Sequence, residues 1–164
     1  MEKDIDIIIY GATGFTGKLC VKYFQSLNTT VTWAMAGRNL IKLQKVADDH
    51  QAKVEILLAD SDDESALDNL TSRARVILST TGPFHRYGSK LVASCIKNHA
   101  HYVDITGENF WVKGLIEKHH AEASAKGIRI IPSCGFDSIP SDLGAFFSAQ
   151  AIGCLLYTSD AADE

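Results

Sequence analysis

Three glycines at every third position form the most chemically informative pattern of this 164-residue sequence. They are Gly11, Gly14 and Gly17. The apolar run Ile5–Tyr10 precedes them and the helix-compatible segment Lys18–Phe24 follows. Gly11 would allow a sharp turn, Gly14 would let the backbone approach a pyrophosphate, and Gly17 would let the helix lie close to the sheet. The free N–H groups of the first helical turn would then face phosphates, so the stretch predicts a strand, a phosphate-binding turn and a helix.

The spacing GxxGxxG, rather than GxGxxG, is typical of nicotinamide-binding loops in a broad group of dehydrogenases and reductases. A glycine-rich turn without a ligand is the alternative for the triplet considered alone. Its position between the first strand and the first helix favours the ligand. The loop residues expected to contact the cofactor are Gly11, Ala12, Thr13, Gly14, Phe15, Thr16 and Gly17.

Arg38 follows the second apolar run, 31–36, where dinucleotide-binding folds read the adenosine ribose. An acidic side chain there would bind a free 2′-hydroxyl and select NAD. Arg38 instead offers a guanidinium to a 2′-phosphate, with Asn39 as a neutral neighbour, so we predict a preference for NADP without excluding NAD. A solvated arginine in a turn is the alternative.

Further cofactor contacts are expected where the third and fourth predicted strands end. Asp60 closes the run 54–59, and its carboxylate could accept a hydrogen bond from the adenine amino group or cap the following helix. The run 75–80 leads across the switch point of a doubly wound sheet, beside the pyrophosphate and the nicotinamide ribose. The residues expected there are Thr80, Thr81, Gly82 and Pro83.

Strand-like and helix-like patterns alternate along the chain and would position these residues. Helical patterns occupy 40–50, 61–70, 87–98 and 110–125, and further short strands are expected at 102–104 and 128–132. Regular alternation implies a parallel sheet. The predicted fold class is α/β, a Rossmann-type doubly wound parallel sheet of about six strands with helices on both faces, forming an NAD(P)-binding domain over residues 1–150.

Composition excludes several classes of function. Hydrophobic residues make up 46% and charged residues 22% of the chain, as in globular proteins. The net charge of -4 and the absence of a basic stripe give no reason to expect nucleic acid. No apolar run approaches the ~20 residues that span a bilayer. The charged start, Met1–Asp4, leads directly into a strand rather than a signal peptide, which predicts a cytoplasmic location with peripheral membrane association as an option.

Cysteine and histidine spacing does not indicate a metal site. The cysteines are far apart and are expected to be buried or half-buried free thiols, at Cys20, Cys95, Cys134 and Cys154. His119 and His120 are adjacent rather than four residues apart, which favours surface residues over metal ligands.

Five ordered motifs resemble the saccharopine dehydrogenase-like oxidoreductases, a family that includes the trans-acting enoyl reductases of lipid biosynthesis. The motifs are Gly11–Gly17, Ala36–Arg38, Thr81–Phe84, Tyr102–Glu108 and Gly135–Asp142. The resemblance covers about residues 5 to 150. It implies an N-terminal NAD(P)-binding domain followed by a larger α+β substrate domain, through which the enzyme could form a homo-oligomer.

Residues 154–164 depart from the family pattern. The peptide CLLYTSDAADE is similar to the in-frame translation of a transposon-type sequencing adapter. We therefore expect the native coding sequence to stop near Gly153 and the chain to be a fragment of a longer two-domain enzyme. A short native polar tail is the alternative, and a genomic read with native codons for 154–164 would support it.

The chain lacks the catalytic pair of a short-chain dehydrogenase, a tyrosine followed by a lysine four residues later. Tyr87 and Lys90 are one residue too close, which favours a tyrosine at a helix start and a solvated lysine. The residues that could orient substrate or exchange a proton are His85, Asp104, Glu108 and Asp137. The turn between Asp104 and Glu108 could aim both carboxylates into one site, although a turn acid and a helix cap explain them equally well.

The sequence thus predicts an NAD(P)-dependent oxidoreductase that transfers hydride to or from a C=C, C=O or C=N bond of a small molecule. The resemblance ranks a lipid-type enoyl or carbonyl substrate ahead of an amino acid. The fragment alone is expected to be inactive, because most substrate contacts would come from the second domain. The alternative is a non-catalytic NADP(H)-binding sensor or scaffold module.

Overall fold

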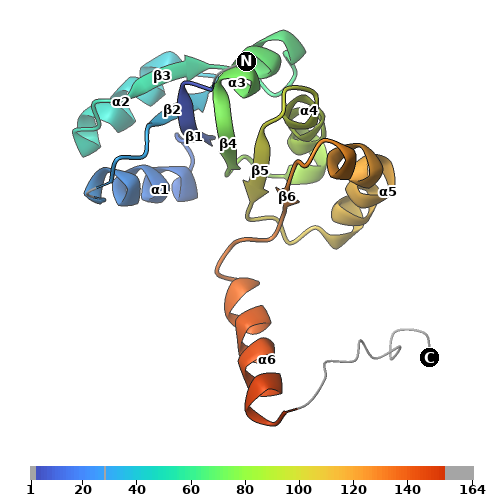
Figure 1. Ribbon diagram of the computed structural model, residues 1–164. Helices are drawn as coiled ribbons and strands as arrows, with labels where there is room; N and C mark the ends of the chain where they lie inside the picture. The colour runs from blue at the N-terminus through green and yellow to red at the C-terminus, as the bar shows by residue number, and fades with distance from the viewer. Residues whose placement is uncertain (1–2, 28, 154–164) are drawn as a thin grey trace.

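The computed structural model describes residues 3–27 and 29–153. In this part of the chain six strands alternate with six helices (Figure 1). In chain order they are β1 (Ile5–Tyr10), α1 (Phe15–Ser26), β2 (Trp33–Gly37), α2 (Leu40–His50), β3 (Glu55–Leu58), α3 (Glu64–Arg73), β4 (Ala74–Ser79), α4 (Phe84–Lys97), β5 (His101–Asp104), α5 (Asn109–Ala125), β6 (Ile130–Ile131) and α6 (Ile139–Ala151).

The six strands form one parallel sheet in the order β3-β2-β1-β4-β5-β6. The chain moves outward from β1 to β3, then returns to the other side of β1 to build β4, β5 and β6. Ile9 pairs with Leu78 and Tyr10 with Ser79, so β1 and β4 end level with each other. This arrangement confirms the predicted doubly wound fold and creates its switch point between β1 and β4.

Helices cover both faces of the sheet, because successive side chains of a strand point to opposite faces. On one face, α1 and α2 pack Val21 and Leu43 into a buried cluster with Ile9 and Met35. The other face is covered by α3, α4 and α5 (Figure 1). The second cluster contains Ile8, which belongs to the same strand, β1, as Ile9. It also contains one buried leucine from each of these helices, Leu67, Leu91 and Leu115.

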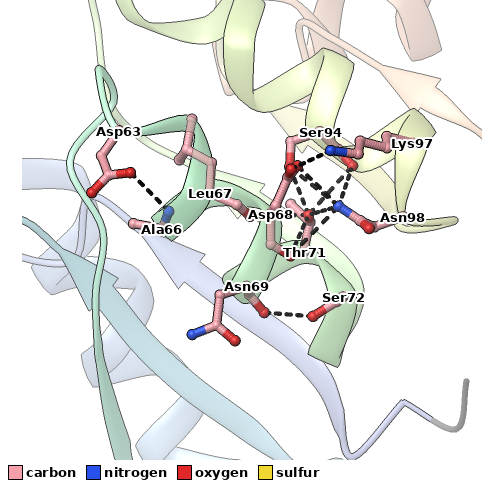
Figure 2. A network of polar contacts seen from close by, with 10 residues as sticks. All are labelled: Asp63, Ala66, Leu67, Asp68, Asn69, Thr71, Ser72, Ser94, Lys97 and Asn98. Atoms are coloured by element: carbon pink, nitrogen blue, oxygen red, sulfur yellow. Dashed lines mark hydrogen bonds and ion pairs between the residues drawn. The ribbon is translucent and has the colours of Figure 1, made fainter.

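A polar network joins α3 to α4 beside the second cluster (Figure 2). The hydroxyl groups of Thr71 and Ser94 lie 2.8 Å apart, and Asn98 Nδ2 donates to Thr71 Oγ1 at 2.9 Å. Asp68 accepts hydrogen bonds from Ser94 at 2.6 Å and from Lys97 at 2.5 Å. These contacts fix the relative position of two neighbouring crossover helices.

Thr71→Val is expected to lower the free energy of unfolding by about 1–3 kcal/mol, because buried polar groups of α4 would face a methyl group instead of a hydroxyl. Urea unfolding of this chain measures the change. Ser72→Ala is the matched control: among the described residues the Ser72 hydroxyl bonds only to Asn69 O of its own helix (Figure 2), so a change within about 0.5 kcal/mol is expected. Equal effects at the two positions would contradict a linking role for Thr71.

The last third of the described chain differs most from expectation. Strand β6 has two residues, where the apolar run predicted five from 128 to 132. Helix α6 extends away from the sheet (Figure 1), and among its residues only Ala149 is buried. Within residues 3–27 and 29–153, no helix has both the length and the apolar character needed to cross a bilayer.

Two expectations about cysteine and histidine were wrong. Cys95 is buried and Cys20 is half-buried, as predicted, but Cys134 is exposed, because it lies in the loop between β6 and α6. Cys154 lies outside the described residues. His119 is buried, at 9% exposure, because it lies on the inward face of α5, whereas its neighbour His120 is exposed.

Candidate functional site

A cavity of about 380 Å³ lies at the carboxyl ends of β1, β2 and β4, beside the switch point of the sheet. The glycine loop after β1 forms one wall and the loop after β4 forms another. The residues that line it are Tyr10, Gly11, Thr13, Gly14, Gly37, Arg38, Ser61, Thr80, Thr81, Gly82, Pro83 and Tyr87. This is the location at which open α/β sheets bind their ligands.

The cavity brings together eight residues proposed from sequence: Gly11, Thr13, Gly14, Arg38, Thr80, Thr81, Gly82 and Pro83. The other six lie outside its lining. Ala12 is buried in the first core cluster, and Phe15, Thr16 and Gly17 begin α1. Asn39 and Asp60 follow β2 and β3.

Two glycines of the loop leave no room for a side chain. Gly11 adopts a φ of +87°, and a Cβ there would overlap the Thr81 hydroxyl. A Cβ on Gly17 would overlap the carbonyl oxygen of Gly11 and lie 2.8 Å from Ala12 Cα. The turn at Gly11 and the close helix at Gly17 therefore have the predicted physical reasons. Gly14 N donates to Gly11 O at 3.0 Å, which closes the turn before α1.

Thr80 and Thr81 bring the loop after β4 against the glycine loop. Thr80 N donates to Tyr10 O at 2.9 Å, and the Thr80 hydroxyl lies 3.2 Å from the carbonyl oxygens of Tyr10 and Gly11. The Thr81 hydroxyl is buried and has no hydrogen-bond partner among the described residues. A buried polar group without a partner costs about 1–3 kcal/mol. The side-chain-free cradle and this hydroxyl fit a phosphate-bearing ligand such as a dinucleotide.

The residues expected around the adenosine have distinct local roles. Arg38 is exposed and forms no ion pair within the described residues. Asn39 Oδ1 accepts from Lys42 N at 2.9 Å and caps α2, which leaves its amide NH₂ free to donate. Asp60 accepts from Asp62 N at 3.0 Å, and Asp63 caps α3 instead. The helix-cap interpretation of Asp60 was therefore wrong, and the adenine interpretation stays a prediction.

Four residues of the cavity were missed by sequence reasoning, including Gly37 at the end of β2. Tyr10 is the last residue of β1, Ser61 follows β3, and Tyr87 lies in the first turn of α4. Burial, followed by the negative charge of Asp60, raises the pKa of Tyr10 to about 12, so its hydroxyl remains a neutral donor. The available signal was position, because polar residues at the carboxyl ends of parallel strands share one edge of the sheet.

Asp104 lies at the end of β5 and is 1% exposed. It accepts hydrogen bonds from the Tyr102 hydroxyl at 2.8 Å and from the N–H groups of Thr106 and Ser133 at 3.0 Å each. Burial raises the pKa of Asp104, and these three donors oppose the increase. The carboxylate therefore joins the loops after β5 and β6, and its oxygens are directed into this buried cluster.

The Glu108 carboxylate is directed at the start of α4. Its oxygens accept from the N–H groups of Phe84 and His85, at 2.8 Å each, and Oε2 lies 2.6 Å from His85 Nδ1. Burial favours the protonated form of Glu108, but these hydrogen bonds outweigh burial and hold its pKa below the usual value. Glu108 occupies the N-cap position of α5, yet its side chain caps α4. Asp104 and Glu108 thus do not share one site.

Comparison with known families identifies the domain. Residues 7–131 match the family described as the saccharopine dehydrogenase NADP binding domain. The chain belongs to this family. The match runs from Ile7, within β1, to the end of β6 and includes both loops that line the cavity at the switch point.

Relatives of this NADP-binding domain include proteins named trans-acting enoyl reductase. Those of Mycobacterium leprae and Mycobacterium tuberculosis strain H37Rv are 40% and 41% identical to the chain over 148 residues. Each match covers 88% of this chain and 35% of the relative. The chain thus spans about a third of the length of these relatives.

Solved structures share the fold of the domain. Saccharopine dehydrogenase (L-Glu forming) from Saccharomyces cerevisiae superposes with a TM-score of 0.75 at 20% identity, over 91% of this chain and 31% of that protein. A short-chain dehydrogenase/reductase family protein has a TM-score of 0.58 at 15% identity, over 79% of this chain and 73% of that one. In the NADP-binding domain, however, Lys90 Nζ contacts Asp62 O at 3.3 Å rather than pairing with Tyr87.

A second cavity of the NADP-binding domain, of about 410 Å³, lies between α5 and β6. Its lining is mainly apolar, and it includes the two adjacent histidines, His119 and His120. Among the described residues, no group of three or more His, Cys, Asp or Glu side chains is arranged to hold a metal ion. The glycine cradle and the Thr81 hydroxyl, which has no partner among the described residues, make the cavity at the switch point the candidate cofactor site.

Proposed function

We propose that this domain binds NADPH in an oxidoreductase that transfers hydride to a C=C, C=O or C=N bond. The observation that carries the proposal is the buried hydroxyl of Thr81, which has no partner in the described part of the chain and lies opposite the glycine cradle, in a cavity at the switch point of the sheet. When bound, the reduced nicotinamide supplies the hydride. Membership of the NADP-binding family supports the choice of cofactor.

Each part of the cavity has a role in this proposal. The N–H groups of the glycine loop and the first turn of α1 bind the pyrophosphate. Thr80, Thr81, Gly82 and Pro83 contact the nicotinamide ribose, and Arg38 binds the 2′-phosphate of the adenosine. Asp60 accepts from the adenine amino group, next to the neutral Tyr10 hydroxyl that donates to Ala59 O at 3.4 Å.

The proposed substrate is a lipid intermediate with an enoyl or carbonyl group. Support comes from the name of the mycobacterial relatives, trans-acting enoyl reductase. In the complete enzyme a second domain selects the substrate, which agrees with the length of those relatives. Residues 154–164, for which we predict an adapter origin, lie outside the described part of the chain.

Titration of the full-length protein with NADPH and NADP tests binding, and absorbance at the nicotinamide band with a panel of enoyl thioesters, ketones and imines tests turnover. We expect NADPH binding and substrate-dependent oxidation. Binding without turnover on the whole panel would favour a redox-sensing or scaffold module. Absence of NADPH binding would contradict both functions.

Arg38→Asp is expected to weaken NADPH binding by about 10- to 100-fold, because a charge-assisted hydrogen bond to phosphate contributes about 1.5–3 kcal/mol. Binding of NADH should change far less, since NADH carries no 2′-phosphate. Fluorescence titration with both nucleotides measures the two dissociation constants.

The matched control for Arg38→Asp is Arg75→Asp. Arg75 lies near the amino end of β4, where it pairs with Asp6 at 3.2 Å, away from the cavity. The control should bind both nucleotides like the unmodified protein. Equal weakening of NADPH and NADH in the Arg38 variant would remove the phosphate role.

A further inference from the structure

His85 lies beside the proposed cofactor cavity, and its imidazole ring is held by a neighbouring side chain. It is the second residue of α4 and follows Pro83, which lines that cavity. Its side chain is 50% exposed, and its ring lies 5.5 Å from the ring of Phe110. The loops after β4 and β5 therefore present an accessible imidazole at the carboxyl edge of the sheet, where substrates of such folds meet the cofactor.

Glu108 determines how the imidazole is used. The carboxylate is fixed by the two backbone N–H groups at the start of α4, and Nδ1 of the ring lies 2.6 Å from Oε2. An ionised carboxylate only accepts hydrogen bonds, so Nδ1 carries a proton. Nε2 has no hydrogen-bond partner among the described residues and is the nitrogen left for a ligand.

We propose that His85 donates a proton from Nε2 to the substrate during reduction, and that Glu108 is its positioning residue. This inference rests on the proposed function. Hydride addition to one atom of a C=C, C=O or C=N bond leaves an electron pair on the conjugated partner atom. The Nε2–H bond breaks and a C–H, O–H or N–H bond forms there, while the reduced nicotinamide becomes oxidised.

The surroundings of His85 suit this step. Glu108 is the negative group in contact with it, and Oε2 lies 2.6 Å from Nδ1. The neighbouring Arg86 guanidinium is turned onto the Tyr87 ring, at 5.6 Å from its centre. Because half of the His85 side chain is exposed, water can return the proton after each turnover.

Each of the other candidate acids lacks either solvent access or a fixed orientation. Asp104 has its oxygens directed into a buried cluster. Asp137 is exposed and has no hydrogen-bond partner for its side chain among the described residues. Burial raises the pKa of Tyr102 well above its usual value, and its hydroxyl already donates to Asp104. His85 alone among these groups combines access with a fixed orientation.

The first test is His85→Asn in the full-length protein, because an asparagine amide can replace the Nδ1 donor to Glu108 but has no titrating Nε2. We expect kcat to fall about 100-fold or more while the Kd for NADPH is unchanged. The decline of kcat at high pH, where the acid loses its proton, should disappear. His99→Asn is the control: this exposed histidine follows the other end of α4 and has a φ of +56°, which asparagine tolerates.

The second test does not depend on turnover. Nitrogen-15 NMR of histidine-labelled full-length protein should show the His85 Nδ1–H tautomer when the ring is neutral. In Glu108→Gln the preference for this tautomer should weaken, since the amide that replaces the carboxylate can also donate to Nδ1. An unchanged His85 tautomer preference in Glu108→Gln would contradict the positioning role.

The outcomes separate this inference from the proposed function. Wild-type protein that binds NADPH but reduces nothing contradicts both. Wild-type turnover with kcat retained in His85→Asn contradicts the role of His85 alone. Equal losses in His85→Asn and His99→Asn would also contradict it, because they would indicate a general effect on α4.

Discussion

Gly17→Ala is expected to destabilise this chain by about 1–3 kcal/mol and to weaken NADPH binding more than tenfold. The added methyl group would overlap the carbonyl oxygen of Gly11 and lie 2.8 Å from Ala12 Cα. Both are backbone atoms, which cannot escape by changing a rotamer, so α1 or the glycine loop must move. The N–H groups that are proposed to bind the pyrophosphate would move with them. Urea unfolding and NADPH titration measure the two effects.

Gly114→Ala is the matched control because it makes the same substitution in another helix. Apart from the adjoining residues and the backbone of its own helix, no heavy atom of the described residues lies within 4 Å of a Cβ at this exposed position of α5. Alanine is the better helix former by about 1 kcal/mol, so the control should be slightly more stable than the unmodified chain and bind NADPH equally well. If Gly17→Ala also stabilised the chain, α1 could not lie as close to the loop as described.

Asp104→Ala is expected to lower the free energy of unfolding by about 3 kcal/mol or more. The change leaves the Tyr102 hydroxyl and the N–H groups of Thr106 and Ser133 without their acceptor. Each buried donor without a partner costs about 1–3 kcal/mol, and water entering the cavity recovers part of this cost. Urea unfolding measures the loss, and faster hydrogen exchange at Thr106 and Ser133 would locate it.

The control for Asp104→Ala is Asp137→Ala. Asp137 is exposed and its carboxylate forms no hydrogen bond within the described part of the chain, so a change within about 0.5 kcal/mol is expected. A small effect at Asp104, similar to that at Asp137, would mean that the loops after β5 and β6 are held by other contacts, such as Cys134 N to Asp104 O at 2.7 Å.

Much of the fold could be predicted from the sequence because its signals are local. Alternation of apolar runs with helical patterns indicated the parallel sheet, and the predicted helix 40–50 agrees with α2. The glycine spacing indicated a tight turn and a closely packed helix, and both follow from backbone geometry within seven residues. Strand ends were less accurate, as β6 shows, since an apolar run continues beyond the residues that pair.

The roles of the polar side chains depended on the tertiary structure. In the sequence Glu108 stands at the start of its own helix, but its carboxylate caps α4, which begins 24 residues earlier. The burial of the Thr81 hydroxyl, and its lack of a partner among residues 3–27 and 29–153, also depend on how the loops pack.

The sequence by itself determined the α/β class, the glycine cradle and the position of Arg38. The tertiary structure decided that Asp104 is enclosed, that Glu108 orients His85, and that Tyr10 lines the cavity at the switch point. The physical reason is that propensity and turn chemistry act over a few neighbouring residues. Contacts between loops depend instead on the parallel register, which brings the carboxyl ends of β1, β4 and β5 to one edge of the sheet.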